Sequence, residues 1–142
     1  MIEHVTFLLA FAGFVILAFD AALAAKRRRL RWLSAIMAAV AVIHVAMVWS
    51  YRYEFSFAQA TRNGYVGFLV FHSALAALIT AVVAPPRIAR WLTLFAFFAV
   101  CVGANGAVFR YEVVRWYRVP VIVCTAAAAT RVWLEMRKSA RP

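Results

Sequence analysis

Five apolar segments, each about as long as a bilayer is thick, are the feature that most constrains this chain. They cover residues 5–25, 32–51, 66–84, 91–109 and 116–134, and each holds 19 to 21 residues. A helix rises about 1.5 Å per residue, so roughly 20 apolar residues cross a hydrocarbon core about 30 Å thick. Of the 142 residues, 67% are hydrophobic and 15% are charged, which is more apolar surface than one soluble core of this size can bury. We predict an all-α integral membrane bundle of five transmembrane helices, forming a single domain over residues 1–142.

The fifth segment carries charge near both of its ends. Arg118 and Arg131 lie within it, and its middle is the run of small residues from Thr125 to Thr130. Long arginine side chains near helix ends can extend to the membrane–water interface. We therefore expect this segment to cross the membrane as well.

The basic residues cluster between the apolar segments and indicate an orientation. The chain carries 16 Lys and Arg against 5 Asp and Glu, a formal net charge of +11. If five spans alternate, one side of the membrane holds ten basic residues: Lys26, Arg27, Arg28, Arg29, Arg31, Arg87, Arg90, Arg137, Lys138 and Arg141. The other side holds five: Arg52, Arg62, Arg110, Arg115 and Arg118. Positive loops face the cytoplasm, so we expect the N-terminus outside and the C-terminus cytoplasmic.

This charge distribution also decides between classes of partner. A strongly basic soluble protein would suggest nucleic acid, but here membrane topology accounts for the charge. We expect a multi-pass protein of the bacterial inner (cytoplasmic) membrane that contacts membrane lipid, with no nucleic-acid partner. Other subunits of a membrane complex, or further copies of this chain, are the expected protein partners.

An internal repeat joins the second and fourth segments. Each begins with Arg-Trp-Leu followed by a hydroxyl residue and is followed by Arg-Tyr-Glu; the copies are residues 31–34 with 52–54, and 90–93 with 110–112. The spacings between the two motifs are 21 and 20 residues. The pattern predicts two parallel helical hairpins, over residues 31–84 and 90–134. The alternative is chance, because Trp and Tyr are common at membrane borders.

Two histidines lie at matching depth in neighbouring spans. His44 precedes Tyr51 by seven residues, and His72 follows Val66 by six, so both sit about 10 Å below the outer surface. The two spans are joined by one loop and run antiparallel. The imidazoles can therefore meet around one centre, which we predict to be a b-type haem with two axial histidines in apolar surroundings. Arg52 and Arg62 are the expected partners of the haem propionates.

Three alternatives compete with haem at these histidines. Each imidazole can simply donate a hydrogen bond across helices, as polar residues do in bundles. Copper is the second alternative, because Met37 and Met47 share a helix face with His44 and Cys101 lies at nearly the same depth, and thioether and imidazole suit Cu(I). A chlorophyll-type pigment is a further alternative occupant.

One acidic and one basic residue lie near the cytoplasmic ends of the first and fifth spans. Asp20 and Arg131 are at comparable depth there. A charge in lipid is costly unless it is paired or reaches the interface. We expect the two to form a structural ion pair that closes the bundle.

The expected function follows from the few polar groups in the spans. Sequence motifs of hydrolases, zinc peptidases and phosphate-binding loops are absent. We predict a small subunit of a redox or respiratory complex that carries one haem for electron transfer, and not a catalytic one. The alternatives are a cofactor-free accessory or assembly subunit, docking a partner through residues 52–65 and 110–118, and a copper-handling or pigment-binding membrane protein.

Three short motifs carry a family resemblance. They are Phe71-His72-Ser73 within a span, preceded by Asn-Gly-Tyr-Val-Gly at residues 63–67, and Arg-Ile-Ala-Arg-Trp at residues 87–91 leading into the next helix. With these motifs the stretch from Arg29 to about Arg110 resembles small multi-helix bacterial membrane proteins of haem–copper oxidase assembly. Those proteins usually carry further histidines at span borders, where this chain holds only arginine.

Overall fold

Seven helical segments follow one another along the chain, and five of them are long. The computed structural model describes residues 2–62 and 64–139, and at residues 2, 3 and 113 it describes the backbone alone. Arg141 of the basic set and Asn63 of the family motif lie outside the described residues. The elements are α1 (Ile2–Ala25), α2 (Arg31–Tyr51), α3 (Phe57–Thr61), α4 (Tyr65–Val83), α5 (Pro86–Arg110), the 3-10 helix η1 (Glu112–Tyr117) and α6 (Arg118–Ser139).

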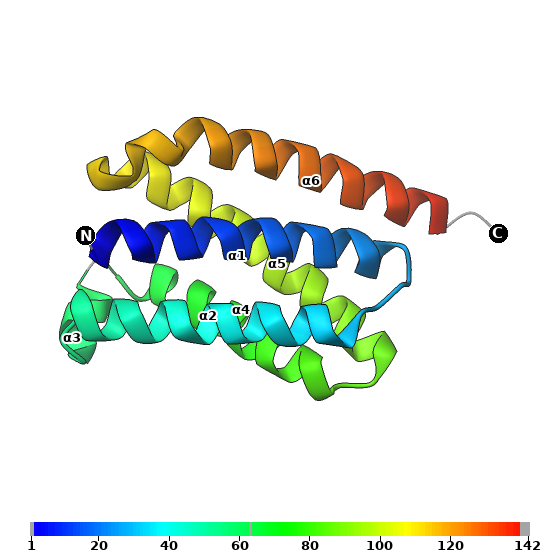
Figure 1. Ribbon diagram of the computed structural model, residues 1–142, viewed down its shortest axis with the longest axis horizontal. Coiled ribbons are helices and arrows are strands. Elements are labelled where there is room, and N and C mark those ends of the chain that lie inside the picture. Colours follow the sequence, from blue (N-terminus) through cyan, green and yellow to red (C-terminus); the bar gives the residue numbers. More distant parts are fainter. Residues whose placement is uncertain (1, 63, 140–142) are drawn as a thin grey trace.

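The five long helices run back and forth between two ends of the molecule (Figure 1). One end holds the start of α1, the short helix α3 and η1; the other holds the α1–α2 and α4–α5 loops and the end of α6. Helix α1 packs against α2, α5 and α6, while α4 packs against α2 and most extensively against α5. Each of the five long helices is long and apolar enough to cross a membrane, and the described residues form no strand. The predicted all-helical architecture with five candidate spans is confirmed.

The observed helix ends differ from the predicted ones where local chemistry intervenes. Helix α5 begins at Pro86, five residues before the predicted start at residue 91. Proline suits the first turn of a helix because the N–H groups there have no partner within the helix, and proline has no N–H. Helix α6 continues to Ser139, five residues beyond the predicted end at residue 134. In its last turns Arg131 forms an ion pair with Glu135, which lies one turn further along the helix. The short helix α3, which hydropathy did not reveal, is capped by the preceding residue Ser56, whose hydroxyl accepts a hydrogen bond from the Gln59 backbone N–H.

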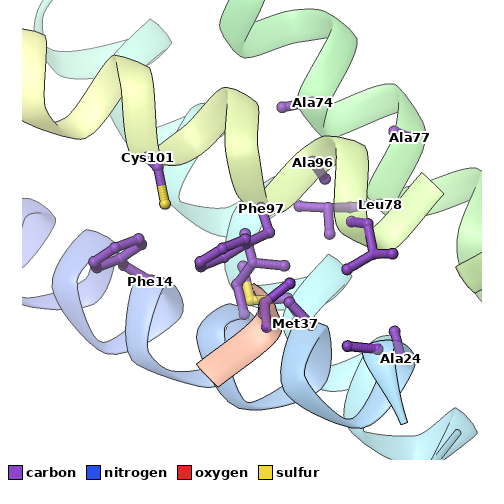
Figure 2. Packing of buried hydrophobic residues seen from close by; sticks show 14 residues of the cluster. Phe14, Ala24, Met37, Ala74, Ala77, Leu78, Ala96, Phe97 and Cys101 are labelled. Atoms are coloured by element: carbon purple, nitrogen blue, oxygen red, sulfur yellow. The ribbon is translucent and has the colours of Figure 1, made fainter. Parts of the chain in front are cut away.

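The buried core lies where all five long helices meet. Its cluster comprises Phe14, Leu17, Ala21, Ala24, Ala25, Met37, Ala74, Ala77, Leu78, Leu94, Ala96, Phe97, Cys101 and Val132. Figure 2 shows Phe97 of α5 lying close to Phe14 and Met37 in this cluster. Half of the cluster is alanine or cysteine, and such small side chains let helix backbones approach closely.

Large apolar side chains also cover the outer faces of the long helices. Exposed examples are Val5, Leu8, Phe19, Ile36, Ile43, Leu69, Phe71, Ile79, Phe95, Phe98, Val102, Val119, Val123 and Trp133. A soluble monomer rarely exposes apolar surface over so many contiguous elements. This surface is of the kind that a hydrocarbon layer covers.

An arginine from the α1–α2 loop caps the end of α4. The Arg29 guanidinium donates hydrogen bonds to the carbonyls of Ala84 and Val82, each at 3.0 Å, and to the carbonyl of Ala81. The last four carbonyls of a helix have no partner within the helix, and they carry the negative end of its dipole. The Arg29 guanidinium therefore stabilises the end of α4 in two ways: it donates hydrogen bonds to these carbonyls, and its positive charge interacts favourably with the negative end of the helix dipole.

Two further arginines cap helix ends on the same side of the molecule. Arg90 of α5 donates to the Ala24 carbonyl at the end of α1 over 3.1 Å. Arg27 donates to the Ser139 carbonyl at the end of α6 over 3.2 Å. The helices that end on this side, α1, α4 and α6, thus all receive an arginine from another element, which fixes their ends relative to one another.

Replacing Arg29 by alanine tests the capping arrangement. Arg29→Ala removes the donors to three carbonyls, and we expect the free energy of unfolding in detergent to fall by about 2 kcal/mol. The matched control is Arg31→Ala, because Arg31 is exposed at the start of α2 and makes no contact of this kind. Equal loss of stability in the two variants would contradict the role given to Arg29.

Candidate functional site

A cavity of about 400 Å³ lies between α1, α2, α4 and α5, toward the end of the bundle that holds the N-terminus. Its walls are mainly apolar and aromatic, and both predicted histidines line it. The other polar side chains that line it are Trp49, Arg52, Tyr53, Arg110, Tyr111 and Tyr117. A large apolar cavity with a few converging polar groups is the usual form of a ligand site.

His44 is half-buried on α2 and contacts α1. Its Nδ1 atom lies 3.2 Å from the backbone carbonyl oxygen of Thr6. A carbonyl oxygen only accepts hydrogen bonds, so in this contact Nδ1 carries the proton and Nε2 of the neutral ring keeps a lone pair. Among the described residues, no donor reaches that Nε2 atom.

His72 is half-buried on α4 and makes two hydrogen bonds. Its Nδ1 atom donates to the Phe68 carbonyl one turn earlier, at 2.8 Å. The indole N–H of Trp49, from α2, donates to Nε2 of His72 at 3.2 Å. The two imidazoles therefore share one tautomer, but the lone pair on His72 is already accepting a hydrogen bond.

Aromatic contacts hold the His72 ring in its orientation. The Phe68 ring stacks on the imidazole with centroids 3.9 Å apart and planes 25° apart. The Trp49 ring meets the imidazole edge-on at 5.9 Å and the Phe68 ring edge-on at 6.3 Å. Since α2 supplies Trp49 and α4 supplies the other two rings, this cluster also joins the two helices.

Two arginines line the cavity beside one tyrosine. The Arg52 guanidinium lies 5.5 Å from the centre of the Tyr111 ring, and that of Arg110 lies 5.9 Å from it. Arg62, the second arginine predicted for the site, is exposed after α3 and does not line the cavity. The prediction missed Arg110, which does line the cavity. The internal repeat could have indicated it, because the repeat aligns Arg110-Tyr111 with Arg52-Tyr53.

The residues expected for copper do not gather at the cavity. Met37 lines it, but Met47 and Cys101 do not, and Cys101 is buried in the core of the bundle. Among residues 2–62 and 64–139 there is no group of three or more His, Cys, Asp or Glu side chains that could hold a metal ion. The cavity thus offers two imidazoles and no further ligand of these types.

The expected ion pair between Asp20 and Arg131 is not formed, and each residue has another partner. Asp20 is 3% exposed and accepts a hydrogen bond of 2.9 Å from the Ser34 hydroxyl. Arg131 is exposed and pairs with Glu135 at 3.2 Å. Both partners are nearer by geometry: Ser34 faces Asp20 across the α1–α2 contact, and Glu135 follows Arg131 by one turn of α6.

Comparison with known proteins does not assign a family. No protein-family model matches the chain, and no curated protein or solved structure shows significant similarity to it.

The Trp49–His72 hydrogen bond predicts different reactivity for the two histidines. Diethyl pyrocarbonate attacks the lone pair of a neutral imidazole, so we expect His44 to react faster than His72 in the detergent-solubilised protein. Trp49→Phe removes the indole donor and should raise the rate at His72 by about fivefold, the factor that corresponds to about 1 kcal/mol. Mass spectrometry of the peptides measures both rates.

The control for this prediction is Trp32→Phe, because Trp32 is 61% exposed and lies far from the cavity along α2. An unchanged rate at His72 in Trp49→Phe would show that the hydrogen bond does not protect it.

Proposed function

We propose that this chain is a small multi-pass subunit of a membrane redox complex, which binds one b-type haem in the cavity between α2 and α4. One observation carries the proposal: two imidazoles from consecutive long helices line a single apolar cavity. In each ring the Nδ1 contact with a carbonyl leaves Nε2 as the nitrogen with a lone pair. Metal-ligating histidines usually bind in this way, with the other ring nitrogen donating to a carbonyl or carboxylate.

The residues present fit such a group, with one rearrangement. His44 and His72 would each supply an Nε2 ligand to the iron, and Trp49 would have to turn away from His72 to release its Nε2 atom. Arg52 and Arg110 would pair with the haem carboxylates, since guanidinium groups bind carboxylates with two hydrogen bonds. When bound, a haem with two histidine ligands carries one electron as its iron alternates between the ferric and ferrous states. The apolar walls would exclude water from it.

The placement in the membrane is part of the same proposal. The apolar outer faces of the five long helices support insertion in a bilayer, and the end with the arginine caps carries most of the basic charge. By the positive-inside rule this end lies in the cytoplasm of a bacterial inner membrane, with the N-terminus outside. The cavity with the two histidines then opens toward the outer face.

A cofactor-free accessory subunit is the second candidate, and a specific contact favours it. The Trp49 indole already satisfies Nε2 of His72 within the protein. Trp116 is 80% exposed on η1, beside the cavity end, and offers an aromatic contact for a partner. A pigment would use the same cavity as haem, whereas copper finds less support because Met47 and Cys101 lie elsewhere.

An absorption spectrum of the purified protein separates these candidates. Protein made in cells supplied with haem precursor should show a Soret band that shifts on reduction by dithionite. His44→Ala and His72→Ala should each lose most of the band, because a single remaining axial histidine binds haem far more weakly. His4→Ala is the matched control, since His4 is exposed and does not line the cavity.

The other possible results of the absorption experiment distinguish the remaining candidates. A band that survives in both cavity variants contradicts the ligand assignment. A colourless protein that also fails to take up added haemin supports the accessory role, a far-red band supports a pigment, and bound copper supports the metal alternative. Circular dichroism of each variant establishes that its helices have formed.

The proposed orientation predicts which loops are accessible from outside the cell. In a background with Cys101 and Cys124 replaced by serine, Arg62→Cys should react with a membrane-impermeant maleimide in intact cells. Arg31→Cys should react only after the membrane is made permeable. The reverse pattern would contradict the orientation, and labelling of both sites in intact cells would contradict the membrane crossing between them.

A further inference from the structure

A second cavity of about 400 Å³ lies at the opposite, basic end of the bundle. It is formed by the end of α1, the loop after it, the start of α2 and the start of α5. Five arginines line it: Arg27, Arg28, Arg29, Arg87 and Arg90. The buried polar residues Asp20, Ser34 and Thr93 line it as well.

Most of the charge in this cavity is already engaged within the protein. Arg27, Arg29 and Arg90 donate to helix-end carbonyls. The Asp20 carboxylate, which also lines the cavity, accepts a hydrogen bond from the Ser34 hydroxyl. Within the described part of the chain it forms no ion pair with the arginines of the cavity.

Two arginines of the cavity remain available. Arg28, from the α1–α2 loop, and Arg87, from the first turn of α5, are both exposed, and among the described residues neither guanidinium forms a hydrogen bond or an ion pair. They approach the same cavity from separate segments of the chain. Two free guanidinium groups beside a hollow offer paired hydrogen bonds in the geometry that phosphate oxygens accept.

The surroundings indicate that the phosphate would be carried by a lipid. Trp91 lines the cavity and is 57% exposed, and Trp32 is 61% exposed at the same end of the bundle, in the first turn of α2. Exposed tryptophans at helix ends sit at the level of the lipid headgroups. Basic pockets between helices on the cytoplasmic side are a known form of anionic-lipid site.

We propose that this arginine-lined cavity binds the phosphate of an anionic phospholipid headgroup through Arg28 and Arg87. The site is independent of the haem proposal, because it lies at the other end of the bundle and shares no lining residue with the first cavity. It does require that the chain lie in a membrane.

Lipid titration of the purified full-length chain tests the proposal. Native mass spectrometry in a neutral detergent should show one tightly held phosphatidylglycerol, with phosphatidylcholine bound at least tenfold more weakly. Arg28→Gln combined with Arg87→Gln should weaken phosphatidylglycerol binding about tenfold, as loss of charge-assisted hydrogen bonds predicts. Phosphatidylcholine binding should not change.

The control is Arg31→Gln combined with Arg137→Gln, which removes the same charge from exposed arginines at this end that do not line the cavity. Equal weakening in the control would overturn the site and leave a general charge effect. Binding of inorganic phosphate as tightly as the lipid would overturn the lipid assignment and indicate a site for free phosphate. Melting temperatures of both double variants establish that they fold.

Discussion

The structure depends on how the chain satisfies its backbone where the helices end. In apolar surroundings a carbonyl that accepts no hydrogen bond costs several kcal/mol, an amount comparable to the stabilisation that side-chain packing provides. At the basic end, Arg29, Arg90 and Arg27 supply donors to the ends of α4, α1 and α6. Because each arginine comes from another element, these hydrogen bonds also hold the helices at a common level. The ends of α1, α4 and α6 are thereby fixed relative to one another.

Side-chain size then explains why the cavity at the other end has apolar, aromatic walls, whereas the cavity at the basic end is lined by arginines. Near the arginine caps the contacts are made by small residues such as Ala24, Ala81 and Ala89, which let the helices close together. Toward the N-terminal end, bulky rings such as Phe68 and Trp49 stand between the helices instead. Large rings cannot fill the space between the helices as evenly, so an apolar cavity remains. The two imidazoles are the side chains in its wall that could bind a metal centre.

The sequence predicted the five helices well because length and hydropathy are strong signals for segments of about 20 apolar residues. It predicted that His44 and His72 share one site, since one loop joins their helices, and both do line one cavity. It did not predict Trp49 as the donor to His72, because the direction of a side chain around a helix depends on packing. For the same reason we expected Arg62 to line the cavity, where the structure places Arg110. We likewise expected Arg131 to be the partner of Asp20, whose hydrogen bond comes from Ser34.

Haem binding at this site requires that both imidazoles present Nε2 to the same cavity. Nitrogen NMR of histidine-labelled protein in detergent, recorded before and after haemin is added, reads the state of each ring nitrogen. Before addition, His44 and His72 should both show a protonated Nδ1 and an unprotonated Nε2. On addition, the signals of His44 and His72 should change together, while those of His4 stay as they were. A change at one cavity histidine alone, or at neither, would contradict the proposed haem site.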